Sequence, residues 1–149
     1  MKKIILLAIF LFSLPACTPS NLVQLEQPDE HNKSSILIYR AHAYQYSAVN
    51  IVFGANGQDL IELEDKSYAQ LDLNSGKYEL FVRTKQADRP ENYEVALKPG
   101  ELVCLKTVAK PSYYAKTLTF GLATLMTSMF SLEKVSCPTP EFLSSYKRN

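Results

Sequence analysis

Residues 71–84 read LDLNSGKYELFVRT, two alternating runs of apolar and polar residues on either side of an Asn-Ser-Gly turn at 74–76. After the turn, Tyr78, Leu80 and Val82 occupy every second position, so a strand places all three on one face. Asn and Gly tolerate the positive φ of tight turns, and we therefore expect a hairpin here. This stretch predicts an antiparallel sheet with one dry and one wet face.

The same pattern extends through the chain, because short runs rich in Ile, Val, Leu, Tyr and Phe recur between turn residues. Their spacing of roughly eight to twelve residues is typical of a β-sandwich or barrel. Residues 54–57 predict a second hairpin, and Pro99-Gly100 fits the centre of a type II turn. We expect a single, mostly β domain at 35–138, an antiparallel β-sandwich. Its strands are expected at 35–40, 48–53, 59–63, 67–73, 77–84, 92–98 and 101–109.

Several motifs of this domain follow one another in a recognisable order. They are Ile-Tyr-Arg at 38–40, the run at 49–57, Ser-Tyr at 67–68, the run at 72–78 and Leu-Lys-Pro-Gly-Glu at 97–101. This order resembles an uncharacterised family of bacterial lipoproteins whose domain is similar to PEGA-type β-sandwiches. The chain departs from the family at 54–58, where Gly-Ala-Asn-Gly-Gln replaces Asp-Gly-Lys, and at 74–76, which lacks a proline. The resemblance implies a PEGA-like, immunoglobulin-like sandwich and brings no established reaction.

The uncharged stretch at 117–132 fits two kinds of secondary structure. Leu118, Leu122 and Leu125 fall at helical spacing, whereas Leu118, Phe120 and Leu122 alternate as they would in a strand. We therefore expect either a helix or irregular cover packed on the sandwich, or a further strand. A surface that faces a partner or a membrane is a third reading.

Residues 139–149 carry the signals of a short C-terminal helix. Thr139 suits the N-cap, Pro140 suits the first helical position, and Glu141 lies near the positive end of the helix dipole. Lys147 and Arg148 follow at the opposite end, so the helix is expected to reach Lys147.

The N-terminus predicts export. Residues 1–16, MKKIILLAIFLFSLPA, combine two lysines with an apolar run too short to span a bilayer, which is typical of a signal peptide. The Leu-Pro-Ala-Cys sequence at 14–17 resembles the lipobox of bacterial lipoproteins, which implies that Cys17 becomes the lipidated first residue. The alternative is cleavage by the ordinary signal peptidase, with Cys17 a free thiol. Thr18 in place of Asp implies sorting to the outer membrane, facing the periplasm.

Residues 17–34 join this anchor to the domain. After Cys17 the segment has two prolines, scattered charges and no sustained apolar periodicity, so we expect a flexible tether. The membrane, reached through the lipid anchor, is thus the first partner that the sequence predicts.

Two further cysteines, Cys104 and Cys137, would be exported to an oxidising compartment with the domain. A disulfide between them would close a loop of about thirty residues. The alternative is a pair of buried free thiols that pack as small apolar groups.

Candidate chemistry is sparse. The only histidines are His31, in the tether, and His42, and neither has a neighbour at metal-ligand spacing, so we expect no metal. His42 is the one plausible base for a hydrolase, but no nucleophile motif accompanies it. No cofactor motif occurs either. An acidic set is expected to be solvated: Asp59, Glu62, Glu64 and Asp65.

Tyrosine is unusually frequent, with nine in the chain. Tyr44, Tyr46, Tyr113 and Tyr114 fall in expected loops, where aromatic rings suit protein or carbohydrate recognition. We regard these four as the candidate contact surface. The competing interpretation is that the tyrosines are half-buried packing residues.

The net charge and the composition exclude nucleic-acid binding and favour a binding module. Sixteen Lys and Arg against fifteen Asp and Glu give a net charge of +1, so no basic footprint for nucleic acid is present. The sequence predicts a lipid-anchored, non-enzymatic envelope module that binds a protein or the cell envelope, without a cofactor. A carbohydrate- or small-ligand-binding module that uses the loop tyrosines is the alternative.

Overall fold

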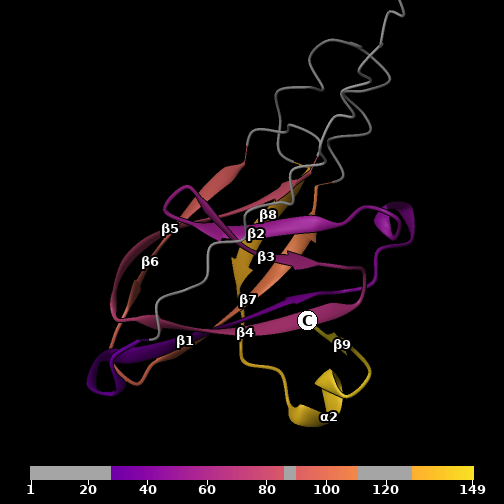
Figure 1. The fold of residues 1–149 in the computed structure, drawn as a ribbon. Helices are drawn as coiled ribbons and strands as arrows, with labels where there is room; N and C mark the ends of the chain where they lie inside the picture. The colour runs from indigo at the N-terminus through magenta and orange to yellow at the C-terminus, as the bar shows by residue number, and fades with distance from the viewer. Residues whose placement is uncertain (1–27, 86–89, 111–128) are drawn as a thin grey trace, which may run out of the picture.

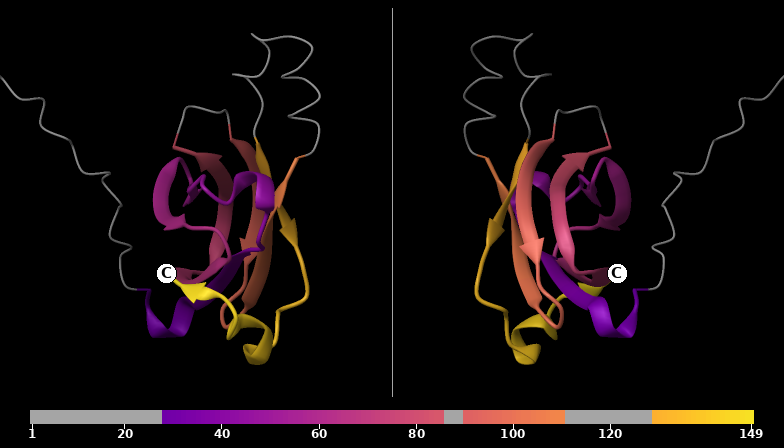
Figure 2. Two further views of the ribbon diagram at one scale, coloured as in Figure 1. Left: turned by 90° about the vertical axis from the view of Figure 1, so that its right-hand side faces the viewer. Right: turned by 90° about the vertical axis from the view of Figure 1, so that its left-hand side faces the viewer.

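The computed structural model describes residues 28–85, 90–110 and 129–149 as two β-sheets packed face to face (Figures 1 and 2). Sheet A has the strand order β8-β7-β1-β4-β9, and sheet B has the order β3-β2-β5-β6. The strands are β1 (Lys33–Arg40), β2 (Ile51–Ala55), β3 (Gln58–Leu63), β4 (Ser67–Asn74), β5 (Gly76–Thr84), β6 (Glu91–Leu97), β7 (Leu102–Ala109), β8 (Phe130–Lys134) and β9 (Lys147–Arg148). Short helices are η1 (Glu30–Asn32), η2 (Tyr44–Tyr46) and α2 (Pro140–Leu143).

The mostly β, two-sheet architecture confirms the expected fold class, and each of the seven expected strands occurs with its ends shifted by a few residues. The expectation of a purely antiparallel fold is wrong, because sheet A is mixed. β1 pairs with β7 in parallel, and β9 pairs with β4 in parallel. Turn residues show where the chain reverses but not which sheet the next strand joins, so the sequence did not reveal this mixture.

The turn at 74–76 illustrates the difference. β4 belongs to sheet A and β5 to sheet B, so the predicted hairpin is wrong and the turn carries the chain between sheets. The hairpin at 54–57 is confirmed between β2 and β3, where Asn56 and Gly57 have φ values of 50° and 76°. At 99–100, Gly100 has φ 75° and the N–H of Glu101 donates to the carbonyl of Lys98 over 3.0 Å, as in the predicted type II turn.

The main core fills the space between the sheets. Ile36 and Ile38 of β1 face it, and so do Leu80 and Val82 of β5, in agreement with the predicted dry face. Phe81 points away from the core, and its ring lies over Gly54, its partner on β2. A Cβ on Gly54 would come within 2.1 Å of Phe81 Cζ, so this close approach requires glycine.

The C-terminal region differs in part from expectation. β8 shows that the end of the stretch 117–132 is a strand, while residues 111–128 lie outside the described part. Thr139 caps α2 as predicted, and its Oγ1 accepts the N–H of Phe142 over 3.3 Å. The helix ends at Leu143 and does not reach Lys147, because residues 147–148 pair with the edge of β4 as β9.

Candidate interaction surface

One end of the sandwich is organised by a buried guanidinium. Arg40, the last residue of β1, is 1% exposed. Its Nη1 donates to the carbonyl oxygens of Val49 at 2.5 Å and Leu63 at 3.2 Å, and its Nη2 donates to that of Tyr46 at 2.6 Å. The guanidinium also lies 5.4 Å from the centre of the Phe130 ring. Arg40 therefore ties the η2 loop, β3 and β8 to the end of β1.

The two described tyrosines of the candidate contact surface have opposite environments. Tyr44 is 89% exposed, so it is available for contact. Tyr46 is 4% exposed and packs edge-on against Phe130 with ring centres 5.3 Å apart, so its assignment to the contact surface is wrong. A tight helical turn points residues two positions apart in different directions, which explains why loop position alone did not separate them.

The remaining sequence candidates at the anchor and beyond β7 are not placed. Cys17 lies within residues 1–27, and Tyr113 and Tyr114 lie within residues 111–128, all outside the described part of the chain. Their roles stay predictions from the sequence.

A histidine and an aspartate form hydrogen bonds at the start of the η2 loop. His42 Nδ1 forms a hydrogen bond with Asp65 Oδ2, and the backbone N–H of Ala43 donates to Asp65 Oδ1 over 3.2 Å. Burial raises the pKa of the Asp65 carboxyl, but the hydrogen bonds from His42 and Ala43, together with the charges of His42 and Arg40, outweigh it and hold that pKa below its ordinary value. His42 thus fastens the loop that carries Tyr44.

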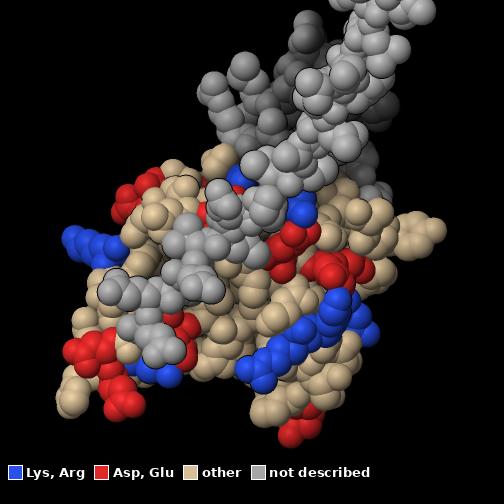
Figure 3. Space-filling model, viewed as in Figure 1, with Lys and Arg blue, Asp and Glu red and all other residues tan. Residues whose placement is uncertain are grey.

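Each carboxylate of the acidic set has its own polar partner. Besides Asp65 with His42, Asp59 pairs with Arg83 at 2.5 Å, Glu62 with Lys85 at 2.7 Å and Glu64 with Lys147 at 2.7 Å. Figure 3 shows acidic and basic side chains side by side on this face of the molecule. Among the described residues, no group of three His, Cys, Asp or Glu side chains is placed to hold a metal ion.

The outer face of sheet B carries a shallow hollow of about 670 Å³. Phe81 and Gly57 contribute to its lining, and the polar side chains around it belong to Gln58, Asp59, Glu79, Arg83 and Asn92. Two polar contacts join residues of this lining, the Asp59–Arg83 pair and a hydrogen bond from Asn92 Nδ2 to Glu79 Oε1. These side chains present both donors and acceptors to a small polar ligand. No sequence pattern indicated this site, because it depends on which strands become neighbours.

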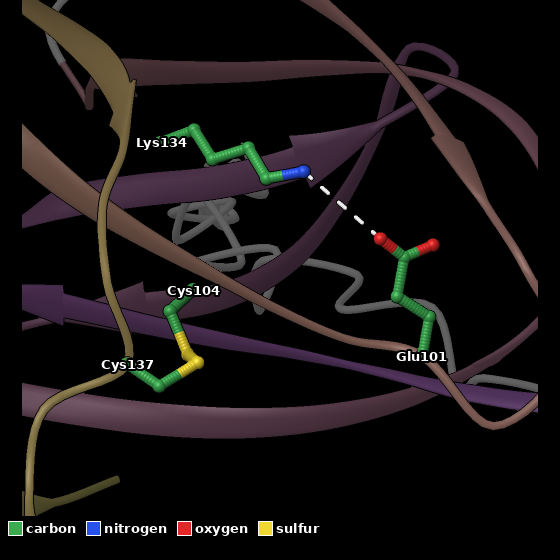
Figure 4. Close-up of a disulfide and its surroundings, with 4 residues drawn as sticks. All are labelled: Glu101, Cys104, Lys134 and Cys137. Atoms are coloured by element: carbon green, nitrogen blue, oxygen red, sulfur yellow. Dashed lines mark ion pairs between the residues drawn. A yellow bond between two sulfur atoms is a disulfide. The ribbon is translucent and has the colours of Figure 1, made fainter.

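A disulfide and the segment after Cys137 cover part of the outer face of sheet A. Cys104 on β7 is bonded to Cys137, 33 residues later, with their Cα atoms 5.1 Å apart. Figure 4 also shows an ion pair at 4.0 Å between Glu101, just before β7, and Lys134, the last residue of β8. The sequence left open whether these cysteines are bonded, and the structure contains the bond.

Comparisons with known proteins assign this chain to no family. No protein-family model matches it, and no curated protein matches it.

Within the described ranges 28–85, 90–110 and 129–149, no helix is long and apolar enough to cross a bilayer. The two-sheet fold and the surfaces described above are therefore the basis for a functional proposal.

Proposed function

We propose that this protein is a lipid-anchored module of the bacterial envelope that binds a protein partner and catalyses no reaction. The observation that carries the proposal is the presentation of Tyr44, 89% exposed on a loop held by Arg40 and by the His42–Asp65 pair. An exposed aromatic ring on a rigid loop offers contact area at a low entropic cost. Such residues are frequent anchors of protein interfaces.

The anchor and the location complete this proposal. The lipobox-like sequence before Cys17 supports lipidation of that residue, and Thr18 supports sorting to the outer membrane, facing the periplasm. The Cys104–Cys137 disulfide is consistent with an oxidising compartment. The two-sheet fold is compatible with a PEGA-like or immunoglobulin-like module at 35–138, joined to the membrane by the tether at 17–34.

A photo-cross-linking residue placed at position 44 in living cells tests this function. We expect one dominant envelope protein to be captured, and we expect its capture to decrease when Cys17→Ser removes the anchor. The matched control carries the cross-linker at the exposed Glu94 of β6, on another face. Absence of a dominant adduct at position 44 in the anchored protein, or the same adduct from position 94, would contradict the proposal.

The hollow on sheet B favours a second candidate, a module that binds a carbohydrate or another small polar ligand. Asp59, Glu79, Arg83 and Asn92 would supply hydrogen bonds to hydroxyl groups. Thermal-shift measurements across a set of envelope glycans test it, with Asn92→Ala as the site variant. A ligand that stabilises the native protein and not this variant would support the second candidate, and flat responses across the set would remove it.

A further inference from the structure

The C-terminal cap, which we define as residues 138–149, covers an apolar cluster that is separate from the main core. Leu37, Tyr39 and Cys104 are buried in this cluster, on the outer face of sheet A, and Leu143 and Tyr146 of the cap pack against them. The core between the sheets contains no residue of the cap. Removal of the cap would therefore uncover Leu37 and Tyr39 without opening the main core.

Aromatic contacts, a short strand and the hydrogen bonds of Asn149 hold the cap in place. The Nδ2 of Asn149 donates to the carbonyl oxygen of Glu62 over 2.7 Å, and its backbone N–H donates to that of Tyr68 over 2.9 Å. Tyr39 makes edge-on contacts with Phe142 and Tyr146, with ring centres 5.8 and 6.0 Å apart. β9 pairs only two residues with β4, and Lys147 forms an exposed ion pair with Glu64. An exposed ion pair stabilises the cap by at most about 1 kcal/mol, and a two-residue strand contributes little further stability.

The two cysteines of the covalent link next to the cap differ in exposure. Cys104 is 1% exposed, whereas Cys137 is an exposed residue immediately before the cap (Figure 4). A thiolate must reach a sulfur atom to break a disulfide, so access directs the attack to Cys137.

We propose that Cys137 is a thiol-exchange site through which a dithiol reductant releases the C-terminal cap from sheet A. The incoming thiolate forms a bond to Cys137 Sγ, the Cys104–Cys137 bond breaks, and its electron pair stays on Cys104 Sγ, which takes up a proton. The second thiol of the reductant, as a thiolate, then attacks the reductant's own sulfur atom in this mixed disulfide, and Cys137 Sγ leaves with the electron pair and takes up a proton. The protein ends with two thiols and the reductant with an intramolecular disulfide.

Release of the cap has a structural consequence. Residues 138–149 lose their nearest covalent attachment to β7. The contacts that remain are the aromatic pairs, the packing of Leu143, β9, the Lys147 ion pair and the hydrogen bonds of Asn149. Burial is the largest cause of the raised pKa values of Tyr39 and Tyr146, whose rings contact each other between sheet A and the cap. Opening exposes the face formed by Leu37 and Tyr39 while the two sheets stay packed.

Native-state reduction of the full chain tests this proposal, with Cys17→Ser to remove the third thiol. We expect dithiothreitol in native buffer to reduce the disulfide about tenfold or more faster than global unfolding in the same buffer. Peptide mapping after treatment with glutathione should find the mixed disulfide on Cys137. Hydrogen exchange should then show lost protection in residues 141–149 and retained protection in Ile51–Ala55 of β2.

A Cys104→Ser/Cys137→Ser variant is the matched control, because its cap should be open before dithiothreitol is added and its exchange should not respond to it. Three results would overturn the proposal. They are reduction no faster than global unfolding, a first adduct on Cys104, and a reduced protein whose residues 141–149 exchange as slowly as before.

Discussion

Replacement of Arg40 by alanine removes the only charged side chain among the largest fully buried side chains of the described residues. The substitution removes the guanidinium donors that now reach the carbonyl oxygens of Val49, Leu63 and Tyr46 at 2.5, 3.2 and 2.6 Å. The Tyr46 oxygen keeps the backbone N–H of Val49 at 3.0 Å. It also removes the cation from the ring of Phe130. The η2 loop would then lose its principal attachment to β1.

The expected cost follows from these contacts. Hydrogen bonds from a charged group contribute about 1.5 to 3 kcal/mol each, and a buried acceptor left without a donor costs about 1 to 3 kcal/mol. The cost of burying the guanidinium is recovered in the variant and offsets part of this sum. We therefore expect Arg40→Ala to lower the free energy of unfolding by about 4 kcal/mol.

Urea denaturation followed by circular dichroism measures this change. Arg148→Ala is the matched control, because Arg148 is exposed on β9, and we expect it to change stability by less than about 0.5 kcal/mol. Arg40→Lys should lie between the two, since an ammonium group retains the charge but cannot reproduce the planar fork of the guanidinium. A loss below about 1 kcal/mol for Arg40→Ala would contradict this estimate, because it would mean that the guanidinium hydrogen bonds are replaced without cost.

Three further changes test other parts of the structure. Cys104→Ala/Cys137→Ala should lower the free energy of unfolding by about 3.7 kcal/mol, from the chain-entropy relation at a separation of 33 residues, and calorimetry that shows no loss would contradict it. Gly54→Ala should cost about 3 kcal/mol in urea denaturation, because the new Cβ would meet Phe81 Cζ at 2.1 Å and the Gln58 carbonyl oxygen at 2.4 Å; unchanged stability would show that this close approach relaxes freely. The hydrogen bond from Lys33, followed by that from Ser35, lowers the pKa of Asp72, so its contribution to stability is complete above the ordinary carboxyl pKa of about 4 and is lost as the pH falls through the lowered value. The stability difference between the native protein and Asp72→Asn should therefore be present at pH 7 and disappear in acid, and a difference independent of pH would contradict this assignment.

Alternation and turn chemistry predicted most of the strands, because both act over a few residues. The run after Asn74 forms β5 with Leu80 and Val82 facing the core, and Asn56-Gly57 makes the hairpin that its tolerance of positive φ predicts. The same local signals could not show that β4 and β5 lie in different sheets. That choice depends on packing between strands that are distant in the sequence.

The candidate surface was predictable only in part, for the same reason. Tyr44 and Tyr46 are two positions apart in one loop, and the aromatic contact with Phe130, far along the chain, decides which of them is buried. The sequence placed Arg40 only within the Ile-Tyr-Arg motif. A single arginine at the end of a strand does not indicate that its guanidinium will donate to three carbonyl groups. β9 was missed because its two residues, Lys147 and Arg148, are polar and take their strand geometry from the edge of β4.

We propose that this chain is exported, is anchored by a lipid on Cys17 and presents its two-sheet domain to an envelope partner. The most direct test is the intact mass of the protein extracted from membranes of a bacterium that expresses the full chain, with Cys17→Ser as the control. The proposal predicts a chain that begins at Cys17, carries diacylglycerol there, and lacks the two hydrogens of the Cys104 and Cys137 thiols. A chain that keeps residues 1–16, or one whose Cys17 carries no lipid, would contradict it.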